Sequence, residues 1–234
     1  MNPFSAFNFG RLIKTFLPGY VHFLSLLLAG YTVANSLGYQ DEFKRLTNHS
    51  EVLLSVGVLA GSLILGILSN MVVWGFVTDR FVRRHFPHDG VLREIREQVV
   101  QHYLSRVSIN GGIKPAHLQA LRTFVDPKYL LMHRIDTAKL VYLEESYWYY
   151  MEFQLNMAVA GIVAYAAFAC YWSHRAFERG LSWKWAAIVV LATLAVGGLW
   201  TICVRTARRN YERHANGLVS LLLGHLPSEP RQPE

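Results

Sequence analysis

Four long apolar stretches, residues 16–37, 52–77, 156–172 and 185–204, constrain this chain more than any other feature. A helix needs about 20 residues to cross the roughly 30 Å hydrocarbon core of a bilayer, and each stretch meets or approaches that length. Lipid offers backbone amides no hydrogen-bond partner, so such stretches cross the membrane as helices. The sequence therefore predicts an all-α, polytopic integral membrane protein with four transmembrane helices in two hairpins.

The formal net charge of +7 is compatible with nucleic acid as a partner. The basic residues, however, flank the apolar stretches, where Lys and Arg orient transmembrane helices and contact anionic lipid headgroups. We therefore expect membrane lipids as partners and do not expect nucleic acid.

Three basic clusters predict the orientation of the helices, because Lys and Arg favour the cytoplasmic side. They precede the first stretch, follow the second and follow the fourth: Arg11 and Lys14; Arg80, Arg83 and Arg84; Arg205, Arg208, Arg209 and Arg213. We expect both termini and the middle segment on the cytoplasmic side of a bacterial inner membrane. The alternative is a cleavable signal peptide with a small-residue site at residues 32–34.

The predicted organisation has four segments. Residues 1–77 form an N-terminal transmembrane hairpin, 78–154 a cytoplasmic helical segment, 155–204 a second hairpin, and 205–234 an amphipathic helix with a disordered tail. In the middle segment, Leu92, Ile95 and Val99 share one face of a helix, and shorter helices are expected at 115–124 and 127–134. From Thr137 the spacing predicts one uninterrupted helix that runs into the third apolar stretch.

Small residues in the second apolar stretch predict close helix packing. Gly57 and Gly61 form a GxxxG motif, and Ser62 and Gly66 repeat the same spacing on an adjoining face. Such spacings let another helix approach closely. The neighbouring helix can belong to the same chain or to a second copy, and the sequence leaves both open.

Four polar residues lie at membrane depth, where polar side chains are costly and usually face protein or water. His22 follows Pro18 by about one turn, so we expect it to reach the lipid headgroups. The other three are Asn35, Asn70 and Asn156, of which Asn70 and Asn156 are expected to form interhelical hydrogen bonds.

The richest cluster of candidate functional residues contains Glu145, Tyr149, Glu152 and Asn156. Their spacing of four, three and four places them on one helix face near the cytoplasmic boundary. One interpretation is a ligand vestibule or an acidic ring at a pore mouth, formed when several subunits meet. The other is an aromatic belt with interfacial ion pairs among helix ends. The segment that follows the second apolar stretch contributes Asp79, Arg80, Arg83 and Arg84 to these pairs.

Enzyme motifs are absent: the sequence contains no HExxH, no GxSxG, no P-loop and no complete set of zinc ligands. Cys170 and His174 are four residues apart, but two ligands alone are a weak metal signal. Cys170 and Cys203 lie about 25 Å apart in an antiparallel hairpin, too far for a disulfide. We expect no catalytic residues, no metal and no cofactor.

These observations predict a non-enzymatic, self-associating inner-membrane protein that acts as a sensor, a gated pore or the membrane partner of a cytosolic effector. A role in stress or anti-phage defence suits its size. One alternative is a membrane-embedded enzyme for lipid-linked substrates that uses Glu145, Glu152, Asp79 and His85. Another is a structural subunit of a membrane complex.

Overall fold

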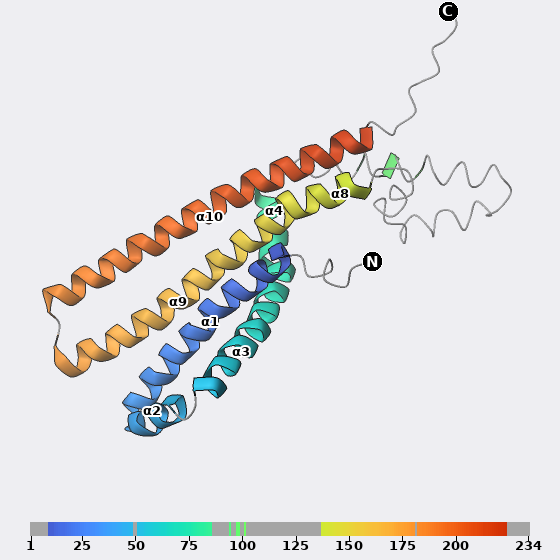
Figure 1. Ribbon diagram of the computed structural model, residues 1–234. Coiled ribbons are helices and arrows are strands. Elements are labelled where there is room, and N and C mark those ends of the chain that lie inside the picture. The colour runs from blue at the N-terminus through green and yellow to red at the C-terminus, as the bar shows by residue number, and fades with distance from the viewer. Residues whose placement is uncertain are drawn as a thin grey trace, which may run out of the picture. The chain divides into compact units, whose positions relative to one another are not determined.

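The computed structural model describes residues 9–48, 51–85, 137–180 and 182–223, together with Glu94, Glu97, Gln98 and Gln101. Every element in this part of the chain is a helix, which confirms the predicted all-α class (Figure 1). In chain order the elements are α1 (Phe9–Ser36), α2 (Gln40–Asn48), α3 (Glu51–Val72), η2 (Val73–Thr78), α4 (Asp79–His85), α8 (Thr137–Leu143), η3 (Glu144–Trp148), α9 (Tyr149–Arg179) and α10 (Trp183–Leu223).

Four helical stretches among the described residues are long and apolar enough to cross a membrane. They cover Ile13–Ser36, Ser55–Phe81, Ala138–Glu178 and Trp183–Leu221. The predicted number of transmembrane helices is therefore confirmed. The predicted helices at 115–124 and 127–134 lie outside the described residues, as does most of the one proposed from residue 92 onward.

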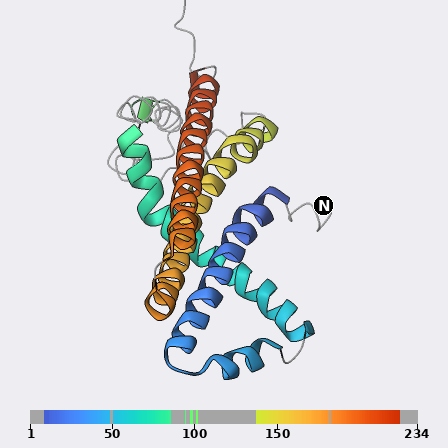
Figure 2. The ribbon, with the colours of Figure 1, turned by 90° about the vertical axis from the view of Figure 1, so that its left-hand side faces the viewer.

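Helix α1 lies between α9 and α3 and packs most extensively against these two helices (Figures 1 and 2). It runs parallel to α9, since Lys14 contacts Glu152 and Asn35 contacts His174. It runs antiparallel to α3, where Thr15 of α1 lies against Gly66. These relative directions are the ones that two successive transmembrane hairpins require.

Glycine sets the distance between α1 and α3. A Cβ on Gly19 would lie 1.8 Å from the backbone oxygen of Ser62, and one on Gly66 would lie 1.9 Å from the backbone oxygen of Thr15. Both contacts are with main chain, so only a residue without a side chain fits at either position.

The small residues named from sequence divide between two environments. Ser62 is fully buried against α1, and a Cβ on Gly61 would lie 2.6 Å from the ring of Phe23. No described atom lies within 4 Å of a Cβ placed on Gly57. The structure thus places Gly61, Ser62 and Gly66 against a helix of the same chain, and Gly57 outside that contact.

The end of α1 is closed by a left-handed glycine. Gly38 has φ +82°. The backbone amide of Tyr39 donates to the carbonyl oxygen of Ala34 at 2.7 Å, and the backbone amide of Gly38 donates to the carbonyl oxygen of Asn35 at 3.2 Å. This pair of bonds is a Schellman motif, which favours glycine at its turning residue. The turn leads directly into α2, a short helix that connects α1 to α3.

Two π-helical segments interrupt the long helices. Segment η2 continues α3, and the hydroxyl of Thr78 donates to the carbonyl oxygen of Val73 at 3.1 Å, five residues earlier. Segment η3 separates α8 from α9, where the sequence predicted one uninterrupted α-helix from Thr137. The chain is helical there, but its turn is wider over five residues.

The described residues fall into two compact units: those within 1–81 and 149–209, and those within 82–148 and 210–234. In the first, α9 and α10 form a hairpin in which the hydroxyl groups of Tyr165 and Thr193 lie 2.8 Å apart. In the second, the ring of Trp148 lies 5.2 Å from that of His214. The four-segment organisation expected from sequence stays a prediction.

Candidate functional site

A buried ion pair joins α1 and α9 near the start of both transmembrane spans. The ammonium group of Lys14 donates a hydrogen bond to the carboxylate of Glu152, and the two side chains are 14% and 5% exposed. The same ammonium lies 4.4 Å from the centre of the Tyr149 ring, an arrangement that adds a cation–π attraction. Charges removed from water persist when they are paired in this way.

A chain of polar side chains begins one turn further along α9. The fully buried Asn156 donates from Nδ2 to Oδ1 of Asn70 at 2.9 Å, and Oγ of Ser69 donates to Oδ1 of Asn156 at 3.4 Å. Nε2 of His22 lies 3.0 Å from Oγ of Ser69. Together these contacts connect α9, α3 and α1 inside the membrane-spanning part of the bundle. We use the name polar core for the ion pair and these hydrogen-bonded side chains together.

Two expectations about intramembrane polar residues can be judged directly. The interhelical hydrogen bonds expected for Asn70 and Asn156 are present. The expectation that His22 reaches the headgroups was wrong, because Pro18 lies inside α1 and does not begin it. His22 is therefore well inside a helix and faces Ser69 of α3.

Three of the four residues proposed as a vestibule, Tyr149, Glu152 and Asn156, belong to the polar core. Glu145 lies in η3, within the second unit. The prediction that Glu145 shares a face with the others depends on 3.6 residues per turn from Glu145 onward. Residues 144–148 form a wider π turn instead, and a common face for Glu145 and the other three residues stays a prediction.

The proposed interfacial cluster lies on α4. Asp79, Arg80 and Arg84 are exposed, and Arg83 is part of the same helix. Its ion pairs stay a prediction. The pair between Lys14 and Glu152 was missed, because the sequence analysis counted Lys14 only among the charges that flank the first span.

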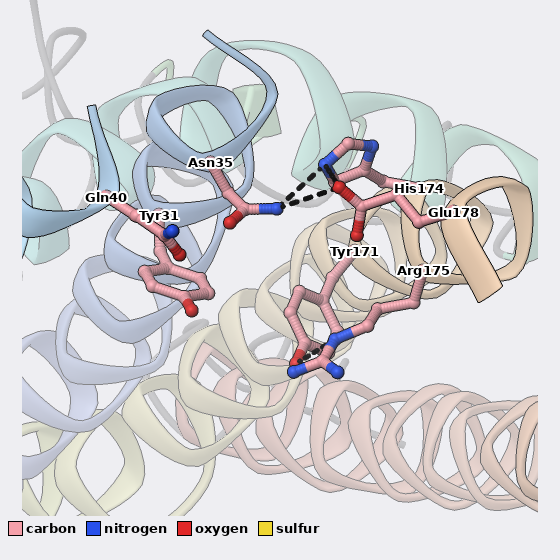
Figure 3. Close-up of a pocket in the computed structure, with 7 residues that line it drawn as sticks. All are labelled: Tyr31, Asn35, Gln40, Tyr171, His174, Arg175 and Glu178. Carbon is pink, nitrogen blue, oxygen red and sulfur yellow. Dashed lines mark hydrogen bonds and ion pairs between the residues drawn. The ribbon is translucent and has the colours of Figure 1, made fainter. Parts of the chain in front are cut away.

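A second polar site lies at the far end of the α1–α9 contact, and we call it the terminal pocket. Nδ2 of Asn35 lies 3.0 Å from Nε2 of His174 and 3.3 Å from Oε1 of Glu178, and the His174 and Glu178 atoms are 3.4 Å apart (Figure 3). The surrounding cavity measures about 90 Å³. Its lining is completed by Tyr31, Gln40, Tyr171 and Arg175.

Three helices build the terminal pocket. The last turns of α1 supply Tyr31 and Asn35, and the Schellman turn leads to Gln40 at the start of α2. The last turns of α9 supply the other four residues. His174 and Glu178 are four residues apart, so they share one face of α9. Sequence reasoning paired His174 with Cys170, but the structure directs the imidazole toward Asn35 and Glu178 (Figure 3).

Comparison with known proteins does not assign this chain to a family. No protein-family model matches it, and neither curated proteins nor solved structures give a significant match. Within the described ranges, no group of three or more His, Cys, Asp or Glu side chains is arranged to hold a metal ion. Functional interpretation therefore depends on the polar core and the terminal pocket.

Proposed function

We propose that this chain is a non-enzymatic membrane sensor, in which the bundle of α1, α3 and α9 transmits a conformational change to residues 82–137. The observation that carries the proposal is the polar core, which ties three membrane-spanning helices together through ionisable and amide side chains. Such groups are rare at membrane depth and commonly mark functional positions.

The polar core suits a two-state element. Each of its contacts joins different helices: Lys14 to Glu152, Asn156 to Asn70, and His22 to Ser69. If α9 slides or rotates by a fraction of a turn, the contacts of Glu152 and Asn156 with the other helices break together. The bundle is then stable only if these buried polar side chains find new partners. A bundle with two discrete sets of polar contacts responds to a stimulus by switching between them.

The π-helical segments lie where such a switch would be relayed. Segment η2 is the last part of the chain before α4, and η3 is the part that leads into α9, so they flank residues 82–137 on both sides. Segment η2 also packs against α9, the helix that carries Glu152 and Asn156. π-helical turns occur frequently at functional positions in helices.

The enzymatic alternative has less support. Of the carboxylates considered for it, Glu152 is buried and bonded to Lys14, which leaves its oxygen poorly placed to exchange protons with a lipid-linked substrate. Self-association, a cytosolic partner and a role in defence remain part of the proposal. The detergent-corrected mass of the purified protein tests the first of these.

Hydrogen exchange tests the proposed transmission. We expect Glu152→Gln, reconstituted in lipid nanodiscs, to change amide exchange in residues 82–137, because the substitution removes a charge from the polar core and leaves the shape of the side chain. The matched control is Leu191→Ala, since Leu191 of α10 is an exposed apolar residue in the same bilayer. If Glu152→Gln alters thermal stability but leaves exchange in residues 82–137 at the wild-type rate, the chain is a structural subunit and not a sensor.

A further inference from the structure

We propose that the terminal pocket is a binding site for a divalent transition-metal ion, with Zn²⁺ as the representative, held by His174, Glu178 and Asn35. The inference rests on the proposed sensor function in one respect: the ion is proposed as the stimulus of that sensor. The binding itself is a separate property of the pocket.

The spacing of the three side chains fits such an ion. The atoms Nε2 of His174, Oε1 of Glu178 and Nδ2 of Asn35 are 3.0, 3.3 and 3.4 Å apart in pairs. Tetrahedral Zn²⁺ with bonds of about 2.1 Å places neighbouring ligand atoms about 3.4 Å apart. The triangle therefore has the size of one face of a zinc coordination shell.

The hydrogen bonding in the pocket also points to a cation. Nδ2 of Asn35 donates to Oε1 of Glu178 and lies within hydrogen-bond distance of Nε2 of His174, which accepts from it in the tautomer that leaves Nε2 without a proton. The amide NH₂ thus occupies the position between two acceptors where a positive charge is best stabilised. Rotation of the Asn35 amide by 180° replaces its donor with a carbonyl oxygen, which completes three ligands.

The surroundings leave room for the ion and for water. The side chains of His174 and Glu178 are 21% and 41% exposed, and the cavity of about 90 Å³ admits a water molecule as the fourth ligand. Arg175 is the one cation among the residues that line the cavity. Its Nε donates to the hydroxyl of Tyr171 at 3.1 Å, which fixes the guanidinium beside that ring.

The donor set indicates the class of metal. Ca²⁺ takes six to eight oxygen ligands, and Mg²⁺ is typically held by one or two carboxylates with several waters. One imidazole, one carboxylate and one amide oxygen favour a borderline ion such as Zn²⁺. We therefore expect selectivity for Zn²⁺ over Mg²⁺ and Ca²⁺ at equal concentration.

Calorimetric titration of the detergent-solubilised full chain with ZnCl₂ tests the site. We expect one binding event that His174→Gln and Glu178→Gln each weaken by at least about tenfold, the smallest loss typical of changes around a metal centre. Tetrahedral Co²⁺ absorption bands should appear in the wild type and be lost in both variants. Each variant is compared with the wild type in metal-free unfolding, so that a folding defect is recognised.

Two matched controls distinguish a built site from general metal affinity. Arg175→Gln alters the same pocket without removing a ligand, and we expect Zn²⁺ affinity to be retained or increased because a positive charge is lost. Asp41→Asn removes an exposed carboxylate from α2, and we expect no change. Equal Zn²⁺ binding by the wild type and by a His174→Gln/Glu178→Gln double variant would show that other histidines bind the ion and would overturn the proposal.

Hydrogen exchange in residues 82–137 with and without Zn²⁺ separates the two proposals. A wild-type response that His174→Gln abolishes supports both. Zn²⁺ binding at His174 without any change in exchange supports the metal site and contradicts its role as the stimulus. If the wild type shows no Zn²⁺ binding that depends on His174, while Glu152→Gln still alters hydrogen exchange in residues 82–137, the metal site is contradicted and the sensor function is supported.

Discussion

At the scale of single residues, the main finding is that charged and amide side chains in the spans are bonded to other helices. Lys14, which the sequence analysis counted as a flanking charge, is only 14% exposed and bonds Glu152. A lysine at this position satisfies the positive-inside pattern and a tertiary contact equally well. Its partner lies 138 residues away, and no local pattern in the sequence indicates that distance.

The ion pair makes a testable contribution to stability. Removing one member of a buried pair typically costs about 3–5 kcal/mol, whereas replacing both with apolar residues is often nearly neutral. We expect Lys14→Met or Glu152→Met alone to lower the free energy of unfolding by about 3 kcal/mol, and the double variant to recover most of that loss. Unfolding by SDS titration in mixed micelles measures all three.

A surface pair in the same chain provides the control for this cycle. Lys44 and Asp41 lie 3.9 Å apart with both side chains mostly exposed, and such pairs contribute little. Asp41→Asn should therefore leave the unfolding curve unchanged. Additive losses from the two single variants of the buried pair would contradict the coupling described here.

At the scale of the elements, sequence patterns predicted the helices well and their contacts less completely. Apolar length was sufficient to locate four spans, because lipid permits so few backbone structures. The GxxxG spacing indicated that α3 has a packing face, but Gly57 carries the motif without contacting α1. Gly19, which makes the closest approach, forms a small-xxx-small pair with Thr15, but this pair was not among the predicted packing motifs.

Alanine substitution on α3 tests this difference between glycines. Gly66→Ala places a methyl group against the backbone oxygen of Thr15, and we expect it to destabilise the fold by about 1–3 kcal/mol, as overpacking does. Gly57→Ala has open space and should be neutral or stabilising by up to about 1 kcal/mol, since alanine favours a helix. Thermal unfolding in one detergent compares the two. Equal losses would show that α3 packs through Gly57 as well.

The π-helical segment η2 has a prediction of its own. Deleting Gly75 should convert its wide turn into an α-turn, because a π turn holds about one residue more than an α turn. We expect this deletion to change hydrogen exchange in residues 82–137. Gly75→Ala keeps the residue count and has no described neighbour within 4 Å of the new Cβ, so it should behave as the wild type. Identical exchange in both variants would contradict a role for the π turn.

At the scale of the whole chain, the order and direction of the spans agree with two hairpins, while the side of the membrane that each end faces stays a prediction. Basic residues determine that side by their effect on how the helices insert into the membrane. Contacts within the chain are the same in either orientation. We expect alkaline phosphatase fused after Leu223 to be inactive and green fluorescent protein there to fluoresce. The reverse pattern would place the C-terminal end outside.

The parallel contact between α1 and α9 has a consequence for biosynthesis. The first hairpin enters the bilayer before the ribosome has made Glu152, Asn156 and His174. In the nascent chain, Lys14, Asn70 and Asn35 therefore lack those partners. Helices insert individually and associate afterwards. Maturation therefore depends on the late arrival of α9, and a product that stops before residue 149 should be a preferred substrate of membrane quality-control proteases.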